Sequence, residues 1–354
     1  MPSGFFQIAV KDIIRQTPEA VQIIFDIPAK LSPQFLYEAG QYITICKTLD
    51  NEEVRRSYSI CSDPKTDLDL SVAVKEVHHG KMSTFLNQSL NRGDLLDIMP
   101  PMGNFQVAKN TEKNQHHFLF GGGSGITPLI SMIKSILNIE GNLATLIYAN
   151  KTEDSIIFKE ELNTIKSKFP KRFKLIHTLD NPSSSWKGLQ GQLNPDSVAE
   201  LVDAYSFSSS VFYICGPNAM MEMVRDTLLN NAIHSEKIRM EYFTATSSSL
   251  LKENETEEVG NEVIESEATL EVYGEVSTVM VEEGQTILEA AQEADLDPPY
   301  SCSAGVCTTC RARIVSGNVV MEEREGLSDA EIEEGFVLTC QSKPTTKNCH
   351  LVFE

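Results

Sequence analysis

The stretch "PYSCSAGVCTTCRA", from Pro299 to Ala312, carries three cysteines spaced C-x4-C-x2-C, and a fourth follows 29 residues later in "FVLTCQS". Thiolates that converge on one metal group require the chain to curl tightly around that group. The small residues between the first two cysteines permit such a curl and let backbone N–H groups point at the sulfurs. We therefore predict a single metal centre. Its expected ligands are Cys302, Cys307, Cys310 and Cys340.

The spacing favours an iron–sulfur centre over two alternatives. C-x4-C-x2-C with a distant fourth cysteine is the plant-type pattern for a [2Fe–2S] cluster. A zinc site usually pairs two C-x2-C knuckles, and this stretch has one; no histidine nearby obviously completes a set of three cysteines and one histidine. Disulfides are disfavoured in a reducing compartment. The other four cysteines are scattered, and we expect small buried side chains at Cys46, Cys61, Cys215 and Cys349.

Length and charge narrow the class of protein. The 354 residues suffice for two or three domains, and the formal net charge of −20 argues against nucleic acid as a partner. The first residues lack the long apolar core of a signal peptide, and no apolar run approaches the span of a bilayer. We expect a cytoplasmic protein without membrane insertion.

The negative charge is concentrated towards the end of the chain. Residues 1–243 carry a net charge of −3, residues 244–267 carry −6, and residues 268–354 carry −11. The middle segment is polar and acidic, so it can bury little surface, and we interpret it as a linker. Its flexibility would let the last domain swing between electron donor and acceptor; a passive tether is the alternative.

The hydrophobic pattern changes along the chain. Short strands separated by turns predict an antiparallel barrel over residues 1–110, with one short helix at 83–90. Apolar strands then alternate with helices, which predicts a parallel α/β domain over 111–243. A hairpin and a helix precede the cysteine stretch. The expected strands are 21–28, 41–49, 55–62, 68–77, 94–100, 116–123, 144–150, 173–179 and 210–216, and the longer helices 127–140, 155–169, 197–205, 218–231 and 285–296.

"RRSYSICS" places Arg56, Tyr58 and Ser59 on one expected strand. A flavin needs a flat aromatic face, a hydrogen-bond donor near its reactive nitrogen and a cation for its pyrophosphate, and Tyr58, Ser59 and Arg56 supply these in turn. The pattern resembles the R-x-Y-[ST] signature of the ferredoxin–NADP reductase superfamily. An ordinary strand with alternating faces would show the same residue types.

Two further stretches resemble this superfamily. "VKEVHHGKMSTFL" is similar to its glycine turn and helix start, where backbone N–H groups bind the flavin diphosphate. "PPMGNF", at residues 100–105, is similar to the end of its barrel. The flavin-binding residues that this resemblance adds are Val74, Lys75, Lys81, Met82, Ser83 and Thr84.

"FGGGSGITPLI" joins an expected strand to an expected helix. It departs from the G-x-G-x-x-G fingerprint because Pro128 stands at the last position, but it resembles the superfamily's G-x-G-x-x-P. Gly123 and Gly125 would let the backbone approach a dinucleotide pyrophosphate. We expect Thr127 to cap the helix and Pro128 to lie in its first turn.

"YICGPNAMMEMV" resembles the superfamily's C-G-P motif, which lies beside the nicotinamide and here comprises Cys215, Gly216 and Pro217. A small residue at a strand end is the simpler interpretation of Cys215. "EYF" resembles the terminal piece near the flavin and adds Glu241 and Phe243. The predicted catalytic residues are Ser59, Cys215 and Glu241.

The sequence leaves the coenzyme open between NADPH and NADH. Lys151 follows an expected strand at the place where members of the superfamily often carry a basic residue for the 2′-phosphate. Glu153 and Asp154 follow closely, and Gln192 stands where relatives often show arginine. Lys151 could equally be a solvated loop residue, so the prediction leans only slightly to NADPH.

Residues 268–354 resemble plant-type ferredoxins beyond the cysteines. The predicted fold is therefore a multidomain chain: an antiparallel β-barrel FAD domain, an α/β parallel-sheet NAD(P) domain and an α+β β-grasp ferredoxin domain. This order resembles the reductase components of oxygenases, and most of all the reductase subunits of phenylacetyl-CoA epoxidases. It implies an NAD(P)H-dependent oxidoreductase that passes electrons through FAD and a cluster near roughly −400 mV to a partner oxygenase.

Reductases for steroid hydroxylases, membrane desaturases and hybrid-cluster proteins share this order, so the electron acceptor stays open. A general electron carrier is a second hypothesis, because the acidic last domain would dock on basic surfaces of several partners. A flavin enzyme with a purely structural cluster is a third, and we disfavour it because the sequence shows no pocket for a small organic substrate.

Overall fold

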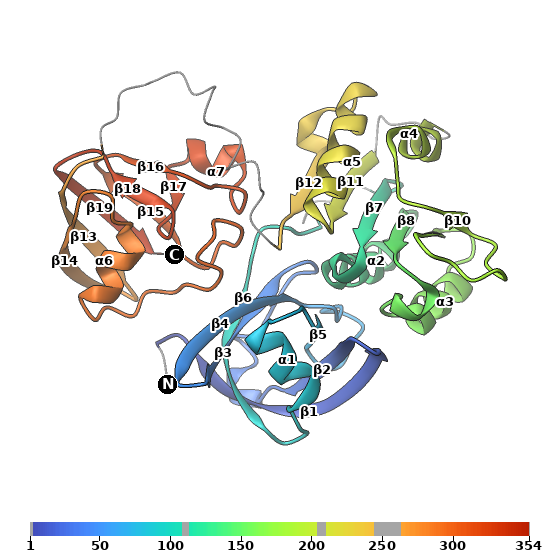
Figure 1. Cartoon of the computed structure of the whole chain (residues 1–354), viewed down its shortest axis with the longest axis horizontal. Coiled ribbons are helices and arrows are strands. Elements are labelled where there is room, and N and C mark those ends of the chain that lie inside the picture. Colours follow the sequence, from blue (N-terminus) through green and yellow to red (C-terminus); the bar gives the residue numbers. More distant parts are fainter. Residues whose placement is uncertain (1–2, 108–112, 204–209, 244–262, 354) are drawn as a thin grey trace. The chain divides into compact units, whose positions relative to one another are not determined.

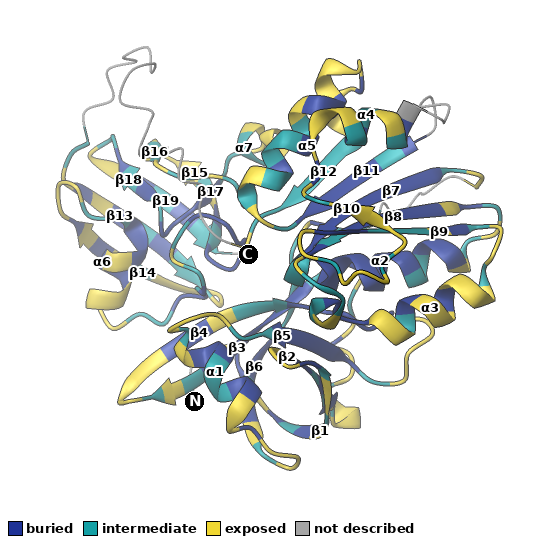
Figure 2. Cartoon of the chain, turned by 45° about the vertical axis from the view of Figure 1, so that its right-hand side comes forward, coloured by how far each residue is buried: buried dark blue, intermediate teal, exposed yellow. Residues whose placement is uncertain are grey.

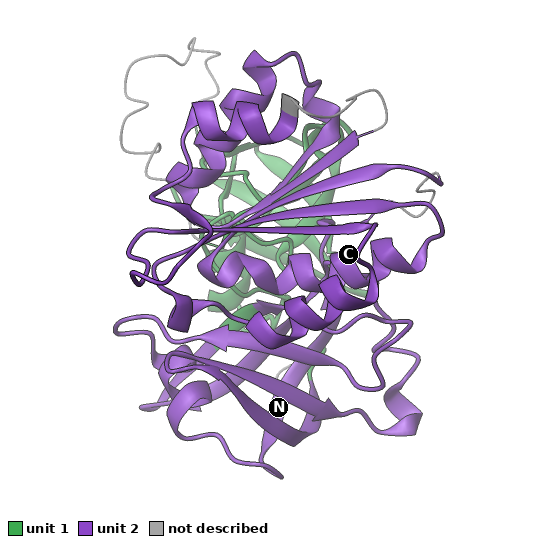
Figure 3. Cartoon of the chain, turned by 90° about the vertical axis from the view of Figure 1, so that its right-hand side faces the viewer, with its two compact units in different colours: residues 1–5, 55–57, 242–354 green, residues 6–54, 58–241 purple. Residues whose placement is uncertain are grey.

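The computed structural model describes residues 3–107, 113–203, 210–243 and 263–353. The chain divides into two compact units, which Figure 3 distinguishes by colour. Unit 1 comprises residues 1–5, 55–57 and 242–354, and unit 2 comprises residues 6–54 and 58–241. The predicted acidic linker at 244–267 lies, up to residue 262, outside the described residues. In the described part of the chain, no helix is both long and apolar enough to span a bilayer.

Unit 2 begins with an antiparallel sheet in the order β4-β3-β6-β1-β2-β5 (Figure 1). A bridge between Ile60 and Val72 joins the end of β4 to β5, so the two edges of the sheet meet and the predicted barrel is confirmed. Fully buried Ile23 and Phe25 alternate with less buried neighbours, as a strand with one inner face requires. The strands are β1 (Phe6–Thr17), β2 (Ala20–Asp26), β3 (Tyr42–Leu49), β4 (Glu52–Ser59), β5 (Ser71–Lys75) and β6 (Leu95–Met102), with η1 (Ala29–Leu31) and α1 (Lys81–Gln88) between them.

A parallel sheet in the order β10-β9-β8-β7-β11-β12 follows the barrel in unit 2. Its central strands are buried on both faces, because α2 and α3 cover one face and α4 and α5 the other (Figure 2). This confirms the predicted α/β domain. The strands are β7 (His116–Gly122), β8 (Leu143–Asn150), β9 (Phe173–Leu179), β10 (Leu189–Gln190), β11 (Ser210–Cys215) and β12 (Ile238–Glu241). The helices are η2 (Gly123–Gly125), α2 (Ile126–Asn138), η3 (Glu153–Ser155), α3 (Lys159–Lys168), α4 (Pro195–Asp203), α5 (Asn218–Asn230) and η5 (Ser235–Lys237).

Unit 1 contains a five-stranded mixed sheet in the order β14-β13-β19-β15-β17 and a separate pair, β16 with β18. β13 and β14 form the predicted antiparallel hairpin, and β19 runs parallel to β13. Helix α6 contributes Ile287 and Ala291 to the core, which confirms the β-grasp fold. The elements are β13 (Ser266–Val272), β14 (Glu275–Val281), α6 (Ile287–Glu293), β15 (Arg311–Ser316), β16 (Val319–Met321), α7 (Asp329–Glu333), β17 (Phe336–Leu338), β18 (Ser342–Pro344) and β19 (Asn348–Phe353).

The two short helices of unit 1 begin with the same hydrogen-bonded device. In each, a hydroxyl accepts from a backbone N–H three residues on, and a glutamate reaches back to the first residue's N–H. Thr286 pairs with Glu289 in α6, and Ser328 pairs with Glu331 in α7. Glu331 also forms an ion pair with Arg311 at 2.9 Å, which ties α7 to the start of β15.

The structure corrects three expectations about secondary structure. Strand β1 was not predicted; two bulges shift its pairing with β2 between Val10 and Asp12 and between Arg15 and Thr17, which breaks the alternation that marks a strand. Edge strand β12 was also missed. The helix expected at 155–169 begins only at Lys159, because residues 156–158 are all buried and lead into a turn in which Phe158 adopts a left-handed φ of +62°.

Candidate functional site

The glycine loop lies at the carboxyl edge of the parallel sheet, where β7 passes into α2. Gly123 adopts φ +53°, and an added Cβ there would meet no atom within 4 Å, so one side of the loop is open. Neighbouring strands β8 and β11 lead to helices on opposite faces of the sheet. Such a switch point is where open α/β sheets bind their ligands.

The loop packs backbone against backbone on the stretch from Cys215 to Pro217. A Cβ added to Gly125 would lie 2.0 Å from the Cys215 carbonyl oxygen and 2.7 Å from the Gly216 nitrogen. A Cβ on Gly216 would lie 2.9 Å from the Gly122 nitrogen. The two glycine motifs, about 90 residues apart in sequence, therefore form one surface, and glycine is required by close approach.

Thr127 does not cap the helix, contrary to our expectation. Helix α2 begins at Ile126 after Gly125, so Thr127 already lies inside its first turn, with Pro128 next. Its buried hydroxyl donates to the Ser124 carbonyl oxygen at 3.1 Å. The 3₁₀ turn η2 extends the helical path backwards and moves the cap position from Thr127 to the glycine.

The three residues predicted to be catalytic meet at the ends of three strands. β11 and β12 are parallel neighbours in which Cys215 pairs with Glu241. Ser59, the last residue of β4, donates from Oγ to Glu241 Oε2 at 3.3 Å. The sequence places these residues up to 182 positions apart, so the fold alone brings them together.

Burial determines whether the side chains of Glu241 and Cys215 carry a proton. It raises the pKa of Glu241 to about 8, although the hydrogen bond from Ser59 acts in the opposite direction. Burial and the nearby Glu241 carboxylate raise the pKa of Cys215 well above its ordinary value. At neutral pH the site therefore contains a neutral thiol and a carboxyl group that retains its proton.

The residues predicted to bind the flavin lie in two places on the barrel. On β4, Arg56 is exposed and Tyr58 half-buried, and strand alternation directs both to one face, while Ser59 is buried on the other. Helix α1 begins at Lys81, after Gly80 and two residues before its expected start at Ser83. Ser83 Oγ accepts from the Val77 N–H and donates to the Gly80 carbonyl oxygen, which fixes the turn before the helix. The first N–H groups of a helix lack partners within it, so those of Lys81, Met82 and Ser83 would suit an anion.

The remaining predicted cofactor residues differ in exposure. The Val74 side chain is buried in the barrel core, and Lys75 lies 3.7 Å from Glu19. Lys151 is exposed directly after β8. Phe243 is exposed and belongs to unit 1. Their cofactor contacts stay predictions.

The four cysteines of unit 1 converge as the sequence predicts. Cys307 Sγ lies 3.2 Å from Cys302 Sγ, and Cys340 interacts with Cys302 and with Cys310. The curl between the first two thiols uses left-handed backbone at Ser303, φ +52°, and Gly305, φ +73°.

Hydrogen bonds from backbone and hydroxyl groups hold these thiols together and favour the ionised form of Cys302. Hydrogen bonds from Cys307 and Cys340 lower the pKa of Cys302, and the N–H groups of Ala304 and Val306 add to that effect. Thr339 donates from both its N–H and its hydroxyl to the Cys310 carbonyl oxygen, which holds the adjacent Cys340 beside Cys310. No group of three or more ligating side chains around a single ion is found among the described residues. Four thiols in close pairs with N–H donors match the four-thiolate ligation of a [2Fe–2S] cluster.

Comparison with known proteins matches three domain families in order. These are an oxidoreductase FAD-binding domain over residues 8–107, an oxidoreductase NAD-binding domain over 119–226 and a 2Fe-2S iron-sulfur cluster binding domain over 270–345. The chain is 33% identical to the ferredoxin reductase component of 3-ketosteroid-9-alpha-monooxygenase from Rhodococcus rhodochrous, over 98% of this chain and 96% of the relative. The chain belongs to the three-domain oxygenase reductases.

Two further comparisons agree with this assignment. A 1,2-phenylacetyl-CoA epoxidase subunit of Escherichia coli K12 is 29% identical to this reductase over 99% of this chain and 98% of the relative. The solved structure of phthalate dioxygenase reductase has a TM-score of 0.61 at 22% identity and covers 99% of this chain and 98% of that chain. The reductase therefore binds FAD, a pyridine nucleotide and a [2Fe–2S] cluster.

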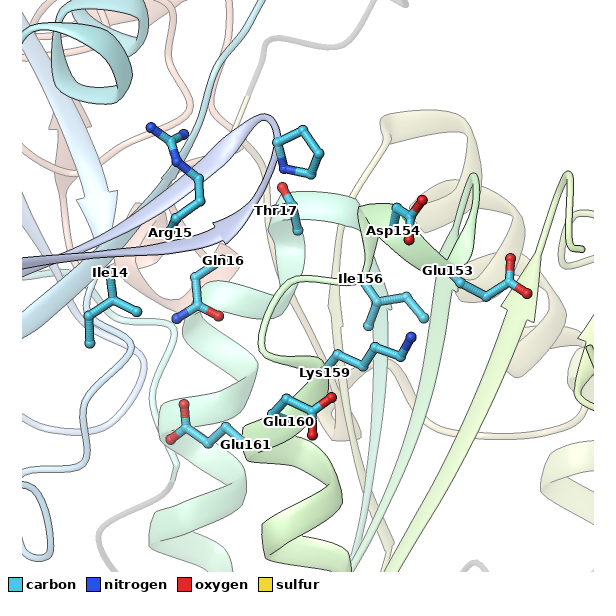
Figure 4. Close-up of a pocket in the computed structure, with 11 residues that line it drawn as sticks. Ile14, Arg15, Gln16, Thr17, Glu153, Asp154, Ile156, Lys159, Glu160 and Glu161 are labelled. Atoms are coloured by element: carbon cyan, nitrogen blue, oxygen red, sulfur yellow. The ribbon is translucent and has the colours of Figure 1, made fainter.

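A separate cavity of about 570 Å³ in the reductase lies between the β1–β2 turn and the start of α3 (Figure 4). Its lining includes Arg15 and Thr17 from the barrel and Glu153, Asp154 and Lys159 from the α/β domain. None of the residues predicted to bind a cofactor lines it. We assign this cavity no part in the reaction.

Sequence reasoning missed two contributors to the nucleotide site. Gly122 was not singled out, yet a Cβ there would lie 2.5 Å from Pro217 Cδ. Tyr148, on β8, donates from its hydroxyl to the Gly123 carbonyl oxygen at 2.9 Å. The run "GGGSG" marks the loop, but no local pattern reports which distant side chain contacts it.

Proposed function

We propose that this reductase takes hydride from NAD(P)H and delivers electrons to the di-iron oxygenase of a phenylacetyl-CoA epoxidase system. The coarser activity, electron transfer from NAD(P)H to an oxygenase component, follows from the family. The specific partner is supported by the end-to-end similarity to the Escherichia coli epoxidase subunit. The similarity to the steroid monooxygenase component is also end to end and has a higher identity, 33% against 29%, so the partner requires a direct test.

The observation that carries the chemistry is the meeting of Ser59, Cys215 and Glu241 beside the glycine loop. Bound FAD would accept hydride from the nicotinamide and release electrons one at a time to the bound cluster. The glycine surface would place the nicotinamide next to Cys215, whose neutral thiol adds no charge there. Ser59 and Glu241 would hold a proton at Ser59 Oγ and Glu241 Oε2, close to the flavin position.

We propose NADPH as the preferred coenzyme. The proposal is supported by Lys151, which is exposed at the carboxyl end of β8, where a cation would favour a 2′-phosphate. The Glu153 carboxylate accepts from the Ser183 N–H and hydroxyl, so its oxygens are occupied by the loop after β9. Lys151→Glu should lower kcat/KM for NADPH about tenfold and leave NADH within about twofold, since one charge contact is lost. An equal loss with both coenzymes would remove the support for this preference.

The partner is tested by coupled turnover. The purified reductase is combined in turn with the oxygenase components of a phenylacetyl-CoA epoxidase, a 3-ketosteroid monooxygenase and a glycine betaine monooxygenase, and product formed per NAD(P)H oxidised is measured. The proposal expects coupling at least about tenfold better with the epoxidase. Failure to couple with it would refute the assigned partner.

A general electron carrier is the second candidate, and the charge distribution is the observation that favours it. Residues 268–354 carry a net charge of −11, which suits docking on basic surfaces of several acceptors. Similar coupling to all three oxygenases, weakened in parallel by salt, would establish this second candidate. The cytoplasmic location stays a prediction.

A further inference from the structure

Tyr148 connects the second strand of the parallel sheet to the glycine loop. The residue lies near the end of β8, and its side chain is fully buried. Its ring passes beneath Gly121, whose added Cβ would lie 3.4 Å from Tyr148 Cδ2. The hydroxyl lies against the loop and donates to the Gly123 carbonyl oxygen at 2.9 Å. Burial raises the pKa of Tyr148, so the hydroxyl keeps the proton that it donates.

This hydrogen bond fixes the direction of one peptide group. The Ile126 N–H also contacts the Gly123 carbonyl oxygen, so two donors hold that oxygen towards the protein interior. The described peptide bonds are all trans, and in a trans peptide the C=O and the following N–H point in opposite directions. The Ser124 N–H must therefore point away from Tyr148. A Cβ added to Gly123 would meet nothing within 4 Å, so there is space beside this peptide for a ligand.

We infer that Tyr148 is a positioning residue for the dinucleotide pyrophosphate, acting through the Gly123–Ser124 peptide. The pyrophosphate attracts N–H groups and repels carbonyl oxygens. Gly123 has unusual freedom to rotate, because glycine adopts left- and right-handed backbone with similar ease. The tyrosine hydroxyl removes that freedom, so that the loop presents a donor before the coenzyme arrives.

The neighbouring peptide is held in the same manner. Thr127 Oγ1 donates to the Ser124 carbonyl oxygen at 3.1 Å, which turns that oxygen towards the helix start. Two hydroxyls, one from β8 and one from α2, therefore direct two consecutive carbonyl groups of the loop inwards. Both hydroxyls therefore act on the loop, and Tyr148 need not contact the coenzyme itself.

Tyr148→Phe removes one hydroxyl and keeps the packed ring. Anaerobic stopped-flow reduction of bound FAD is measured with NAD(P)H and with N-benzyl-1,4-dihydronicotinamide, a hydride donor without pyrophosphate. We expect the Kd for NAD(P)H to rise roughly three- to tenfold, the range of one neutral hydrogen bond. The limiting reduction rate and the rate with the benzyl compound should change by less than about twofold.

Two controls separate positioning from general disturbance. Tyr37→Phe removes a half-buried tyrosine hydroxyl that pairs with Ser62 Oγ at 2.7 Å in the barrel, and it should leave the Kd for NAD(P)H unchanged. If Tyr148→Phe does not fold with bound FAD, Thr127→Val carries the test, and Thr127→Ser, which keeps the hydroxyl, should restore the affinity. An unchanged Kd, or equal losses with both hydride donors, would overturn the inference. Because FAD reduction by the benzyl compound does not depend on the partner oxygenase, the outcome is independent of the proposed electron acceptor.

Discussion

Replacement of Gly125 by alanine is the sharpest test of how the nucleotide site is built. Gly125 has φ −62° and ψ −8°, which any residue adopts, so backbone conformation does not require glycine. The requirement is steric, since the new Cβ would lie 2.0 Å from the Cys215 carbonyl oxygen. Ordinary contact begins at 3.4 Å, so the loop and the end of β11 would have to separate by about 1.4 Å.

This displacement sets the expected losses in stability and in the rate of FAD reduction. The obstacle is main chain, so no side chain can rotate away, and we expect a loss of about 1–3 kcal/mol in the free energy of unfolding. Misplacement of reacting groups by about 1 Å costs roughly 100-fold in rate. Gly125→Ala should therefore lower FAD reduction by NAD(P)H by about that factor. Reduction by dithionite, which needs no nucleotide site, should be unaffected.

Gly123→Ala is the matched control in the same loop. Gly123 has φ +53° but open space around it, so alanine there meets backbone strain of about 1–2 kcal/mol without a clash. Urea unfolding and stopped-flow reduction at several NAD(P)H concentrations measure both variants. If Gly125→Ala reduces FAD at the native rate, or if Gly123→Ala is the more damaging change to the limiting rate, the packing argument is wrong.

The other predictions concern a carboxyl group, the cluster and an ion pair. Burial raises the pKa of Glu241 from its ordinary 4.5 to about 8, so the folded protein holds a proton that the unfolded chain releases between these values. The melting temperature should fall as pH rises through this window, and Glu241→Gln should remove that slope; an unchanged slope would contradict the assignment. Cys307→Ser should abolish cytochrome c reduction but spare ferricyanide reduction, whereas Cys349→Ser, at a buried cysteine outside the cluster, should spare both. Lys134 lies 2.8 Å and 2.5 Å from two carboxylates, with its side chain 11% exposed. Lys134→Met should lower the free energy of unfolding by about 1–2 kcal/mol in urea titrations, because it leaves both carboxylates half-buried without their cation, and no change would show that solvent screens the network.

Motifs with a fixed spacing were predictable because their chemistry is local. The four cysteines are identified by C-x4-C-x2-C and a distant partner, and the structure brings their sulfurs together. The presence of α1 follows from a glycine turn followed by residues that favour a helix, although the helix begins at Lys81 rather than at Ser83. The fold class follows from the change of hydrophobic period between the barrel and the α/β region.

Features that depend on distant contacts were not predictable. No pattern around Tyr148 reports that its hydroxyl reaches a loop 25 residues earlier. The fit of Gly125 against Cys215 requires the register of two strands and the path of the loop between β7 and α2. Strand β1 was missed because its bulges break the alternation on which strand prediction relies.

Glu331 links the unwinding of helix α7 to the release of Arg311. It closes the cap of α7 through Ser328 and holds Arg311, the residue directly after the predicted ligand Cys310. A helix of five residues has no spare turn to lose, so α7 unwinds as a whole once its cap opens. Unwinding then frees the arginine beside a cluster ligand. We therefore expect the lifetime of the cluster to depend in part on a helix that supplies none of its predicted ligands.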